Sequence, residues 1–366
     1  MSRQVEPDPE NWWARYGHRV GPTGHPPAPP PGRGPRTAGE LTDDVIVRRH
    51  AEVPAEGWRG LVHRVSGGLV NPGPSVQEQV RRDLVHRLRR PLSSTHRIAV
   101  TSIKGGVGKT TVATCLGLAL AEHRGDRVVV LDANPDAGTL ADRLTGESSV
   151  TVRELLRDLD RIHSWADITR YTSLAGRLQV LASEQDPAAG DAFNREEYER
   201  ISQALSRFFN IVITDSGTGL VHSAMEGTLT LADSVIIVGA PTVDGASRAS
   251  KTLDWLLAHG HPELADSALV VLSCDRTSDE VDAVRIREHF AARSRAVVEV
   301  PHDPHLATGG RVDLARLRPR TRDAFLELAA LVADRFDRHL PEPAVPAPVR
   351  PPAAPGPGPA YPGRGE

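Results

Sequence analysis

The chain has 366 residues, 39% of them hydrophobic and 25% charged, which fits a globular protein with a full core. Its formal net charge of −3 excludes a global basic field, so we expect no nucleic-acid partner. No apolar run approaches the ~18 residues that span a membrane, and the polar, Pro-rich N-terminus does not resemble a signal peptide. We therefore expect a cytoplasmic protein whose two cysteines, Cys115 and Cys274, are core thiols.

Both ends of the chain are rich in proline. Residues 1–40 hold nine prolines and residues 341–366 hold ten, of 30 in the whole chain. Such segments cannot bury enough apolar surface to fold, so we predict a disordered tail over each range. The tails act either as solubilising segments or as docking sites for a partner that reads proline-rich sequence.

Residues 41–95 form a small basic segment before the main domain. Ser75 and Glu78 have the spacing of a capping box, which predicts a helix over 76–90. This helix either lies on an acidic membrane surface or acidic partner, or packs on the main domain with its arginines in solvent. Its apolar stripe comprises Val80, Leu84, Val85 and Leu88, and its basic face comprises Arg81, Arg82, Arg87, Arg89 and Arg90.

From residue 96 to residue 340, short apolar runs alternate with helical patterns. The runs are β-branched and apolar on both faces, as buried parallel strands require. Helices between them build βαβ units, so we predict an α/β domain with a mostly parallel sheet and helices on both faces. The predicted strands are 98–101, 127–131, 178–181, 211–214, 234–238, 268–272 and 296–300, and the predicted helices include 110–123, 245–259 and 321–339.

The loop after the first predicted strand, residues 104–111, reads Lys-Gly-Gly-Val-Gly-Lys-Thr-Thr and holds two of the chain's three lysines. Arginine is the usual cation elsewhere, which suggests that lysine has a task here that arginine cannot perform. Lysine is a compact point charge that fits a tight phosphate cradle, whereas a guanidinium group is broad and planar. The standard phosphate loop has a glycine where this chain has Ile103, so the loop is a variant.

We expect this loop to cradle the phosphates of a nucleotide, because a strand ends before it and a helix begins within it. Lys109 is predicted to contact the β- and γ-phosphates, Thr110 to bind Mg²⁺ and Thr111 to contact the α-phosphate. The predicted fold is accordingly that of a P-loop NTPase. The backbone N–H groups around the phosphates would come from Gly105, Gly106, Val107 and Gly108.

Two aspartates at strand ends complete the predicted site. Asp215 follows the strand 211–214 and precedes residues 216–219, Ser-Gly-Thr-Gly. This placement suits an outer-sphere Mg²⁺ ligand beside a loop that senses the γ-phosphate. Asp132 ends the strand beside the phosphate loop and is a candidate for orienting the attacking water. The alternative for either aspartate is a helix cap or a turn residue.

The loop 104–111 resembles the deviant Walker A box of the MinD/ParA ATPases, and the resemblance covers residues 98–340. It implies an enzyme that binds ATP and Mg²⁺, forms a homodimer on ATP binding and separates after hydrolysis. In that family the early lysine, here Lys104, reaches the phosphates of the partner subunit. The resemblance therefore adds Lys104 to Lys109, Asp132 and Asp215 as predicted catalytic residues.

Other positions match motifs of this family in part. Residues 132–136 resemble its D-x-D-P box, with Asn134 in place of the second aspartate. Because an amide cannot take a proton, we expect slow or partner-dependent hydrolysis. Pro301 and Asp303 resemble the V-P-x-D loop on the adenine side of the nucleotide. Ser273 stands where the family often has an asparagine that reads adenine.

A narrower resemblance is to the MinD-like ATPases associated with ESX type VII secretion. It is carried by residues 57–59, 71–75, 132–138 and 243–246. It implies a cytoplasmic ATPase that acts at a membrane secretion machine, either free or peripheral at the inner face of the plasma membrane. Asp244 in the last of these segments is also a candidate N-cap for the helix 245–259.

The leading hypothesis is an ATP-dependent switch that dimerises and regulates or assembles a secretion complex. One alternative is division-site positioning or chromosome and plasmid partitioning. The acidic charge balance argues against a DNA-binding face, and the Pro-rich C-terminus argues against an amphipathic anchor. The second alternative is a nucleotide-binding scaffold with negligible hydrolysis, which Asn134 motivates.

Overall fold

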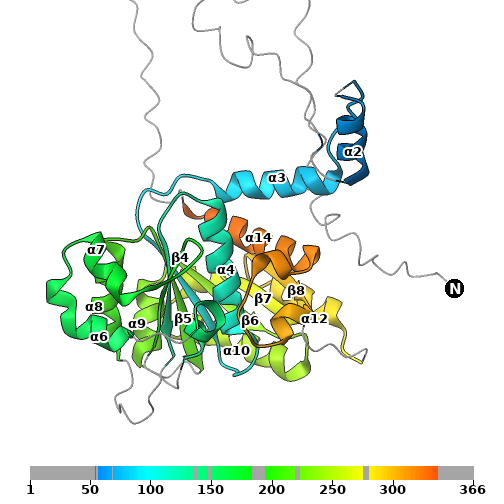
Figure 1. Ribbon diagram of the computed structural model, residues 1–366. Helices are drawn as coiled ribbons and strands as arrows, with labels where there is room; N and C mark the ends of the chain where they lie inside the picture. Colours follow the sequence, from blue (N-terminus) through cyan, green and yellow to red (C-terminus); the bar gives the residue numbers. More distant parts are fainter. Residues whose placement is uncertain are drawn as a thin grey trace, which may run out of the picture.

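The computed structural model describes residues 54, 57–67, 69–134, 138–146, 150–183, 194–218, 223–274 and 280–336. The predicted tails 1–40 and 341–366 lie outside these residues. The described chain forms three layers, with a central sheet between two layers of helices (Figure 1). None of its helices is long and apolar enough to cross a bilayer.

The central sheet has eight strands in the order β3-β4-β2-β5-β1-β6-β7-β8. All neighbours are parallel except β3 and β4, which confirms the predicted α/β class and all seven predicted strands. Sequence patterning missed only β3, a three-residue edge strand. The strands are β1 (His96–Ser102), β2 (Val128–Ala133), β3 (Ser173–Ala175), β4 (Leu178–Leu181), β5 (Ile211–Thr218), β6 (Ser234–Gly239), β7 (Leu269–Cys274) and β8 (Ala296–Pro301).

Successive side chains of the strands point to opposite faces of the sheet, and both faces are buried. On one face, Val128 and Val130 pack in a cluster with residues of α4 and α14. On the other face, Val129 packs with α6 and α8, and Val235 packs with α10. This two-sided burial explains why the strands read as continuous apolar runs.

The helices connect the strands and cover the two faces of the sheet. The predicted helix 321–339 begins two residues earlier and ends at Ala333, and residues 337–339 lie outside the described part. The helices are α2 (Gly57–Val65), α3 (Val76–Leu88), α4 (Lys109–His123), α5 (Leu140–Leu144), α6 (Val152–Asp158), α7 (Trp165–Ile168), α8 (Arg195–Ser206), α9 (Ser223–Leu231), α10 (Val243–Ala258), α11 (Pro262–Asp266), α12 (Ala283–Ala291), α13 (Pro304–Ala307) and α14 (Pro319–Ala333).

The start of α10 corrects one expectation from the sequence. Thr242, and not Asp244, is the N-cap residue, because its hydroxyl accepts a hydrogen bond of 3.1 Å from the backbone N–H of Gly245. Asp244 instead lies in the first turn, where a carboxylate is favoured by the helix dipole. Its side chain is therefore available for another contact, described below.

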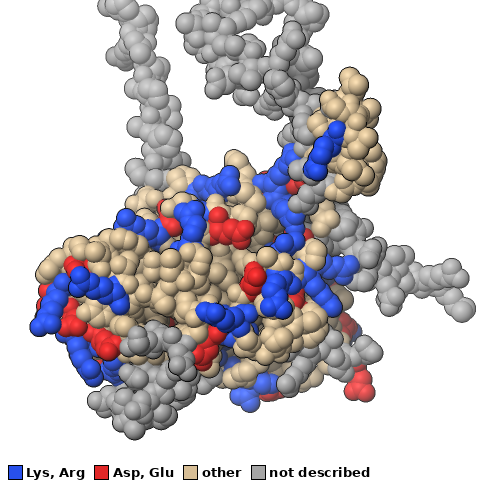
Figure 2. All heavy atoms as spheres, in the orientation of Figure 1, with Lys and Arg blue, Asp and Glu red and all other residues tan. Residues whose placement is uncertain are grey.

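Charged side chains of both signs are interspersed over the face of the body shown in Figure 2. This mixing agrees with the formal net charge of −3 and leaves no broad basic field on the face in view.

Helix α3 packs on α14 as part of the main core. The backbone N–H of Glu78 donates to the hydroxyl of Ser75, which caps the helix as predicted. Val80, Leu84 and Leu88 are buried in the same cluster as the sheet. Of the two placements left open by the sequence, the structure therefore shows packing on the main domain.

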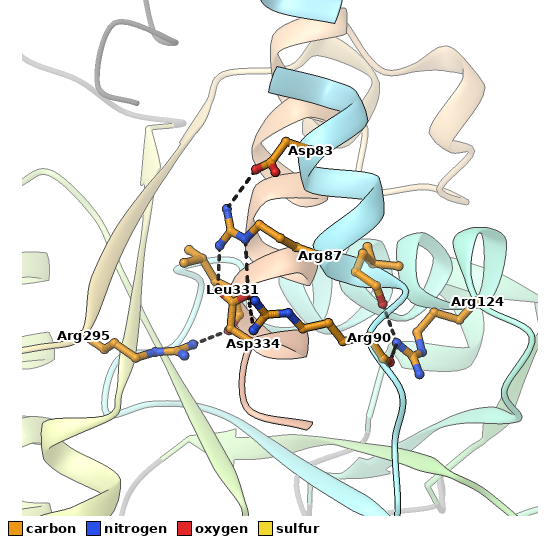
Figure 3. Close-up of polar contacts among 8 residues, drawn as sticks. Asp83, Arg87, Arg90, Arg124, Arg295, Leu331 and Asp334 are labelled. Atoms are coloured by element: carbon orange, nitrogen blue, oxygen red, sulfur yellow. Dashed lines mark hydrogen bonds and ion pairs between the residues drawn. The ribbon is translucent and has the colours of Figure 1, made fainter. Parts of the chain in front are cut away.

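Three arginines of α3 and the residues just after it are held by carboxylates of α14 and its C-cap. Arg81 donates from two nitrogens to Asp323, at 3.1 and 2.7 Å, and Asp323 is buried. Arg87 and Arg90 both contact Asp334, at 2.6 and 3.4 Å (Figure 3). Three of the five arginines of the predicted basic face, Arg81, Arg87 and Arg90, thus form a seam of ion pairs with α14 and its C-cap. Arg82 pairs with Glu78 on α3 itself, and Arg89 is exposed.

The segment between α3 and β1 is also held in place by hydrogen bonds from a residue at the end of α4. Arg124, at the end of α4, donates to the carbonyl oxygens of Leu88 and Arg90 (Figure 3). Its guanidinium carbon lies 4.7 Å from the ring centre of Phe336. Only 6% of Arg124 is exposed, and its guanidinium group also pairs with Asp126 at 2.5 Å, so this cation is fully engaged within the protein.

Candidate nucleotide-binding site

The loop between β1 and α4 has the backbone geometry of a phosphate cradle. Gly106 and Gly108 have φ values of 72° and 94°, in the left-handed region that favours glycine. Gly108 is the N-cap of α4 and offers no side chain to the first turn. No described residue accepts a hydrogen bond from the backbone N–H of either glycine, so both donors are open to an anion.

Lys109 begins α4 at the centre of the loop and is only 8% exposed. Burial lowers the pKa of its ammonium group, and the nearby carboxylate of Asp215 acts in the opposite direction. A buried ammonium group needs negative charge around it. Lys109 is therefore placed to bind an anion at the start of the helix.

Asp132 and Asp215 lie side by side on the adjacent parallel strands β2 and β5. Burial raises the pKa of Asp215 to about 7, with a further increase from Asp132, while Thr110 and Lys109 lower it. Burial likewise raises the pKa of Asp132 to about 6. The Oδ1 atom of Asp215 is buried and has no hydrogen-bond partner. Two crowded carboxylates with one oxygen unsatisfied form a site that would accept a cation.

The strand β5 extends further than the sequence suggested. It runs to Thr218, so Asp215 lies inside the strand and not at its end. Residues 216–218, expected to belong to a switch loop, are part of this strand, and Gly219 lies outside the described residues. The pairing with β1 shifts between Val100 and Ser102, where the register is irregular.

The loop after β2 holds Asp132 tightly. Its two carboxylate oxygens accept hydrogen bonds of 3.1 Å from the backbone N–H groups of Asn134 and Leu140. Gly138 lies so close that an added Cβ would be 1.9 Å from Oδ2 of Asp132 and 2.2 Å from Oγ of Ser183. Asp132 is therefore a fixed, oriented carboxylate, and residues 135 and 136 of the D-x-D-P-like box lie outside the described part.

These residues fit a magnesium nucleotide. The hydroxyl of Thr110 lies close enough to Asp215 to lower the pKa of its carboxyl group, so the two predicted metal ligands are adjacent. The unsatisfied Oδ1 atom of Asp215 is an acceptor without a donor, as a hydrated cation would require. Lys109 and the open N–H groups of the loop supply the positive side of the site.

The structure adds Arg143 to the predicted residues. Arg143 lies on α5, is 8% exposed, and donates a hydrogen bond of 2.7 Å to the hydroxyl of Thr111. It brings a second cation to the position predicted for the α-phosphate. No motif in the sequence indicated Arg143, because α5 is only five residues long and its partner lies 32 positions away.

Lys104, the early lysine of the loop, contacts a residue of its own chain. Its Nζ atom lies 2.7 Å from a carboxylate oxygen of Asp244, and both side chains are partly exposed. The other oxygen of Asp244 accepts from Arg248, at 2.8 Å. Hydrogen bonds from Lys104 and Arg248 lower the pKa of Asp244. The predicted role of Lys104 toward a partner subunit would require it to leave this contact.

The residues predicted on the adenine side lie at the ends of β7 and β8. Ser273 borders the phosphate loop, since its Oγ atom would be 3.5 Å from a Cβ at Gly108. Pro301 is opposite Cys274, the residue after Ser273, across the two strands. The structure thus places Ser273 beside the phosphate cradle and Pro301 on the neighbouring strand.

Asp303 has a structural task in the described chain. Its carboxylate accepts hydrogen bonds from the backbone N–H groups of His305 and Arg318, at 2.9 and 2.8 Å. Burial alone would raise the pKa of Asp303, but these bonds and the hydroxyl of Thr321 lower it below the ordinary value. Asp303 therefore caps α13 and fixes the start of α14, and its contact with adenine stays a prediction.

Comparison with known families assigns the class of this site. Residues 98–308 match the CobQ/CobB/MinD/ParA nucleotide binding domain. This match spans more than half of the chain, and the chain therefore belongs to the MinD/ParA family of nucleotide-binding proteins.

Among individual relatives, the ESX-1 secretion-associated protein EspI of Mycobacterium tuberculosis is 37% identical over 290 residues. The alignment covers 78% of this chain but only 43% of EspI. The septum site-determining protein MinD of Synechocystis is 31% identical over 163 residues, covering 44% of this chain and 59% of that protein. The chain thus spans less than half the length of the EspI sequences it matches.

Solved structures show the same fold. A ParA family ATPase from Chlorobium tepidum has a TM-score of 0.57 and 18% identity, covering 64% of this chain and 99% of that chain. The cell division ATPase MinD of Pyrococcus furiosus has a TM-score of 0.52 and 21% identity, covering 65% and 98%. MinD of Pyrococcus horikoshii, solved in complex with Mg-ADP, has a TM-score of 0.52 and 21% identity, covering 64% of this chain and 94% of that chain.

Proposed function

We propose that this chain binds ATP with Mg²⁺ at the loop 104–111 and hydrolyses it slowly. The observation that carries the proposal is the buried Lys109 beside Asp215, whose Oδ1 atom has no partner in the protein. An unsatisfied buried carboxylate is costly, and a hydrated metal bound together with an anion would satisfy both groups. The relatives that share the family support ATP as the nucleotide.

Each residue of the site has a distinct task in this proposal. The open N–H groups of the loop and Lys109 hold the phosphates, and Arg143 supports Thr111 at the α-phosphate. Mg²⁺, when bound, supplies positive charge to the phosphate oxygens beside Thr110 and Asp215. Asp132, held by two backbone N–H groups, orients a water. Asn134 next to it can hold a water but cannot accept its proton, which makes turnover slow.

Nucleotide binding is tested by calorimetry of the full chain with Mg²⁺ and either ATP or a non-cleavable analogue. Lys109→Ala should weaken binding by about 10- to 150-fold, since it removes a charged hydrogen bond from a buried site. Lys251→Ala is the matched control, because Lys251 is an exposed lysine on α10. Equal binding by Lys109→Ala and wild type would refute the proposed site.

Hydrolysis is tested separately by phosphate release in single turnover. Asn134→Asp should restore a proton acceptor beside Asp132 and raise the rate severalfold. Binding without measurable turnover in either protein would leave a nucleotide-binding scaffold as the function. That result would refute the ATPase part of the proposal and retain the binding site.

We further propose that ATP closes a homodimer and that this switch regulates or assembles a membrane secretion machine. The similarity to EspI supports the secretion role, and Lys104 at the rim of the site supports cross-subunit contact. The chain would act in the cytoplasm or at the inner face of the membrane, and the proline-rich tails are candidate docking segments. Sedimentation with the non-cleavable analogue tests dimerisation: a monomer at all protein concentrations would refute it.

A further inference from the structure

Helix α2 presents its apolar face outward. Trp58, Leu61 and Val65 lie within an arc of about 60° on the helix, at 100° per residue. Their exposed fractions are 66%, 61% and 79%. The residue of α2 that is buried is Gly60, which lies on the opposite side. Burial of this helix is thus reversed relative to α8, where the large apolar residues face the core.

The exposed apolar surface continues into the turn after α2. Ten large apolar side chains are exposed among the described residues, and six of them lie between positions 58 and 76. Such a concentration marks an interaction surface rather than scattered surface residues. Figure 1 shows α2 at the outer end of α3, beyond the sheet, so this surface projects from the body. It comprises Trp58, Leu61, Val65, Leu69, Val70 and Val76, called the α2 face below.

The charged side chains within residues 57–77 are all positive. Arg59 and Arg64 flank the apolar arc on its two sides, and residues 57–77 contain no Asp or Glu. Arg59 also fixes the geometry, because it lies 5.5 Å from the ring centre of Trp58 and donates to the carbonyl oxygen of Pro74 at 3.1 Å. Figure 2 shows blue atoms among the tan ones on the projecting end, with no red.

Helix α3 differs from α2, because the side chains of its apolar stripe are buried and therefore cannot form an interaction surface. Arg81 and Arg87 are engaged by Asp323 and Asp334, Arg82 pairs with Glu78 of the same helix, and the apolar stripe is buried in the main core. In contrast, Arg59 and Arg64 of α2 form no ion pair with a carboxylate of the described residues. The two features of an interfacial helix, an open apolar face and flanking cations, occur together only on α2 among the described helices of the N-terminal segment.

We propose that the α2 face binds the surface of a bilayer that contains anionic lipids. Trp58 suits the interfacial region, where its ring and N–H group meet both apolar and hydrated surroundings. Leu61 and Val65 enter the boundary of the acyl chains, and Arg59 and Arg64 contact the headgroups. The absence of acidic residues from 57–77 favours an anionic surface over an ordinary protein partner. Nine residues cannot span a bilayer, so the helix lies on the surface.

The test is co-sedimentation of the nucleotide-free full chain with vesicles, so its outcome does not depend on ATP binding. Vesicles of phosphatidylglycerol and phosphatidylcholine in equal parts should retain the chain, and phosphatidylcholine alone should retain much less. Retention should fall as salt is added, because screening weakens the arginine contacts. Hydrogen exchange of residues 57–66 should slow only with the anionic vesicles.

Two variants assign the effect to the α2 face. Trp58→Ser with Leu61→Ser should weaken vesicle binding by at least about tenfold, and Arg64→Gln by about fivefold. The matched controls are Leu174→Ser with Leu257→Ser, which removes exposed apolar groups elsewhere, and Arg170→Gln, which removes an exposed arginine. All substituted side chains are exposed, so the variants should fold as the wild type does.

Three results would overturn the proposal. The first is no retention of the wild type on anionic vesicles, and the second is equal retention of wild type and the Trp58/Leu61 variant. The third is self-association without vesicles that this variant abolishes, which would assign the α2 face to a second copy of the chain. Loss of binding in the variant alone, with both controls unchanged, supports the membrane contact.

Discussion

The α3–α14 seam and the phosphate loop both place cations against carboxylates that are largely withdrawn from water. In the seam, Asp323 accepts two hydrogen bonds from Arg81, and Asp334 is shared by Arg87 and Arg90. In the loop, Lys109 lies near Asp215, but one oxygen of that carboxylate has no partner and its pKa is raised to about 7. The seam is satisfied within the protein, whereas the loop is satisfied only in part.

This difference separates charges that build the fold from charges that await a ligand. Complete pairing makes the seam a structural element that should contribute to stability and tolerate no loss of a partner. Incomplete pairing makes the site costly to the empty protein and favourable to a bound metal and anion. Removing a carboxylate charge should therefore lower stability in the seam and raise it at Asp215.

The largest effect is expected at the apolar base of the seam. Leu84→Ala should lower the free energy of unfolding by about 2–5 kcal/mol, because it leaves a cavity between α3 and α14. Val76→Ala on the same helix should change it by less than about 0.5 kcal/mol, since Val76 is 60% exposed. Denaturant unfolding measures both. Similar values for the two variants would show that α3 is not an integral part of the core.

The next effect concerns the loop that holds Asp132. Gly138→Ala places a methyl group where Oδ2 of Asp132 and Oγ of Ser183 now lie, so the loop or the carboxylate must move. Such overpacking should lower the free energy of unfolding by about 1–3 kcal/mol, and we expect slower hydrolysis as well. Gly125→Ala is the control, since an added Cβ there meets nothing within 4 Å. Unchanged stability in Gly138→Ala would contradict the tight packing around Asp132.

Replacing the buried aspartate of the site should stabilise the nucleotide-free protein. The folded pKa of Asp215 is raised above its ordinary value of 3.8 to about 7, so the folded state binds more protons between these values. Stability therefore falls as pH rises from about 4 to about 7, and the cost is fully present above that range. Asp215→Asn should remove this cost and raise the Tm near pH 8 by about 2–4 °C for each kcal/mol recovered.

The same variant should lose its response to Mg²⁺. Wild-type nucleotide affinity should gain more from Mg²⁺ at about pH 8 than at about pH 6, because deprotonation of Asp215 prepares the metal site. Asp215→Asn should show little gain at either pH. Thermal scans across pH, followed by calorimetry with and without Mg²⁺, check both expectations. A Tm below that of the wild type near pH 8 would count against an uncompensated carboxylate.

The smallest effect is expected at the exposed pair of Lys104 and Asp244. Asp244→Ala should free Lys104 and lower the protein concentration needed for dimerisation with the non-cleavable analogue by a few-fold. Sedimentation velocity measures this shift. In the Asp244→Ala variant, the protein concentration needed for dimerisation should also depend less on salt than in the wild type. The variant lacks the ion pair between Lys104 and Asp244 that salt would otherwise screen. A higher concentration requirement in this variant would show that Asp244 assists the dimer.

Local patterns were enough to predict the main strands and the phosphate loop. Buried parallel strands are apolar on both faces, so they stand out as short β-branched runs. The edge strand β3 is three residues long, antiparallel and contains Ser173 and Ala175, and it carries no such signal. The predicted end of β5 was too early because the irregular pairing with β1 lets the strand continue through Gly217.

Contacts between distant residues were the part that sequence patterning could not supply. Arg81 and Asp323 are 242 positions apart, and no local rule pairs them. Arg143 reaches Thr111 only because α5 returns to the phosphate loop. The residue type of Asp244 suits a helix cap, but that of Thr242, two residues earlier, suits it as well, and the backbone places Thr242 at the cap.

The short strand β3 has a consequence for how copies of this chain can meet. The outer rim of a parallel sheet exposes unpaired backbone groups that can recruit a foreign strand. In this chain the edge strand at that end is β3, which has three residues and runs antiparallel to β4. Three residues are too few to pair stably with a strand of another molecule. Continuous sheets built from successive molecules are thereby disfavoured at this end, which is compatible with the proposed dimer contact through side chains at the nucleotide site.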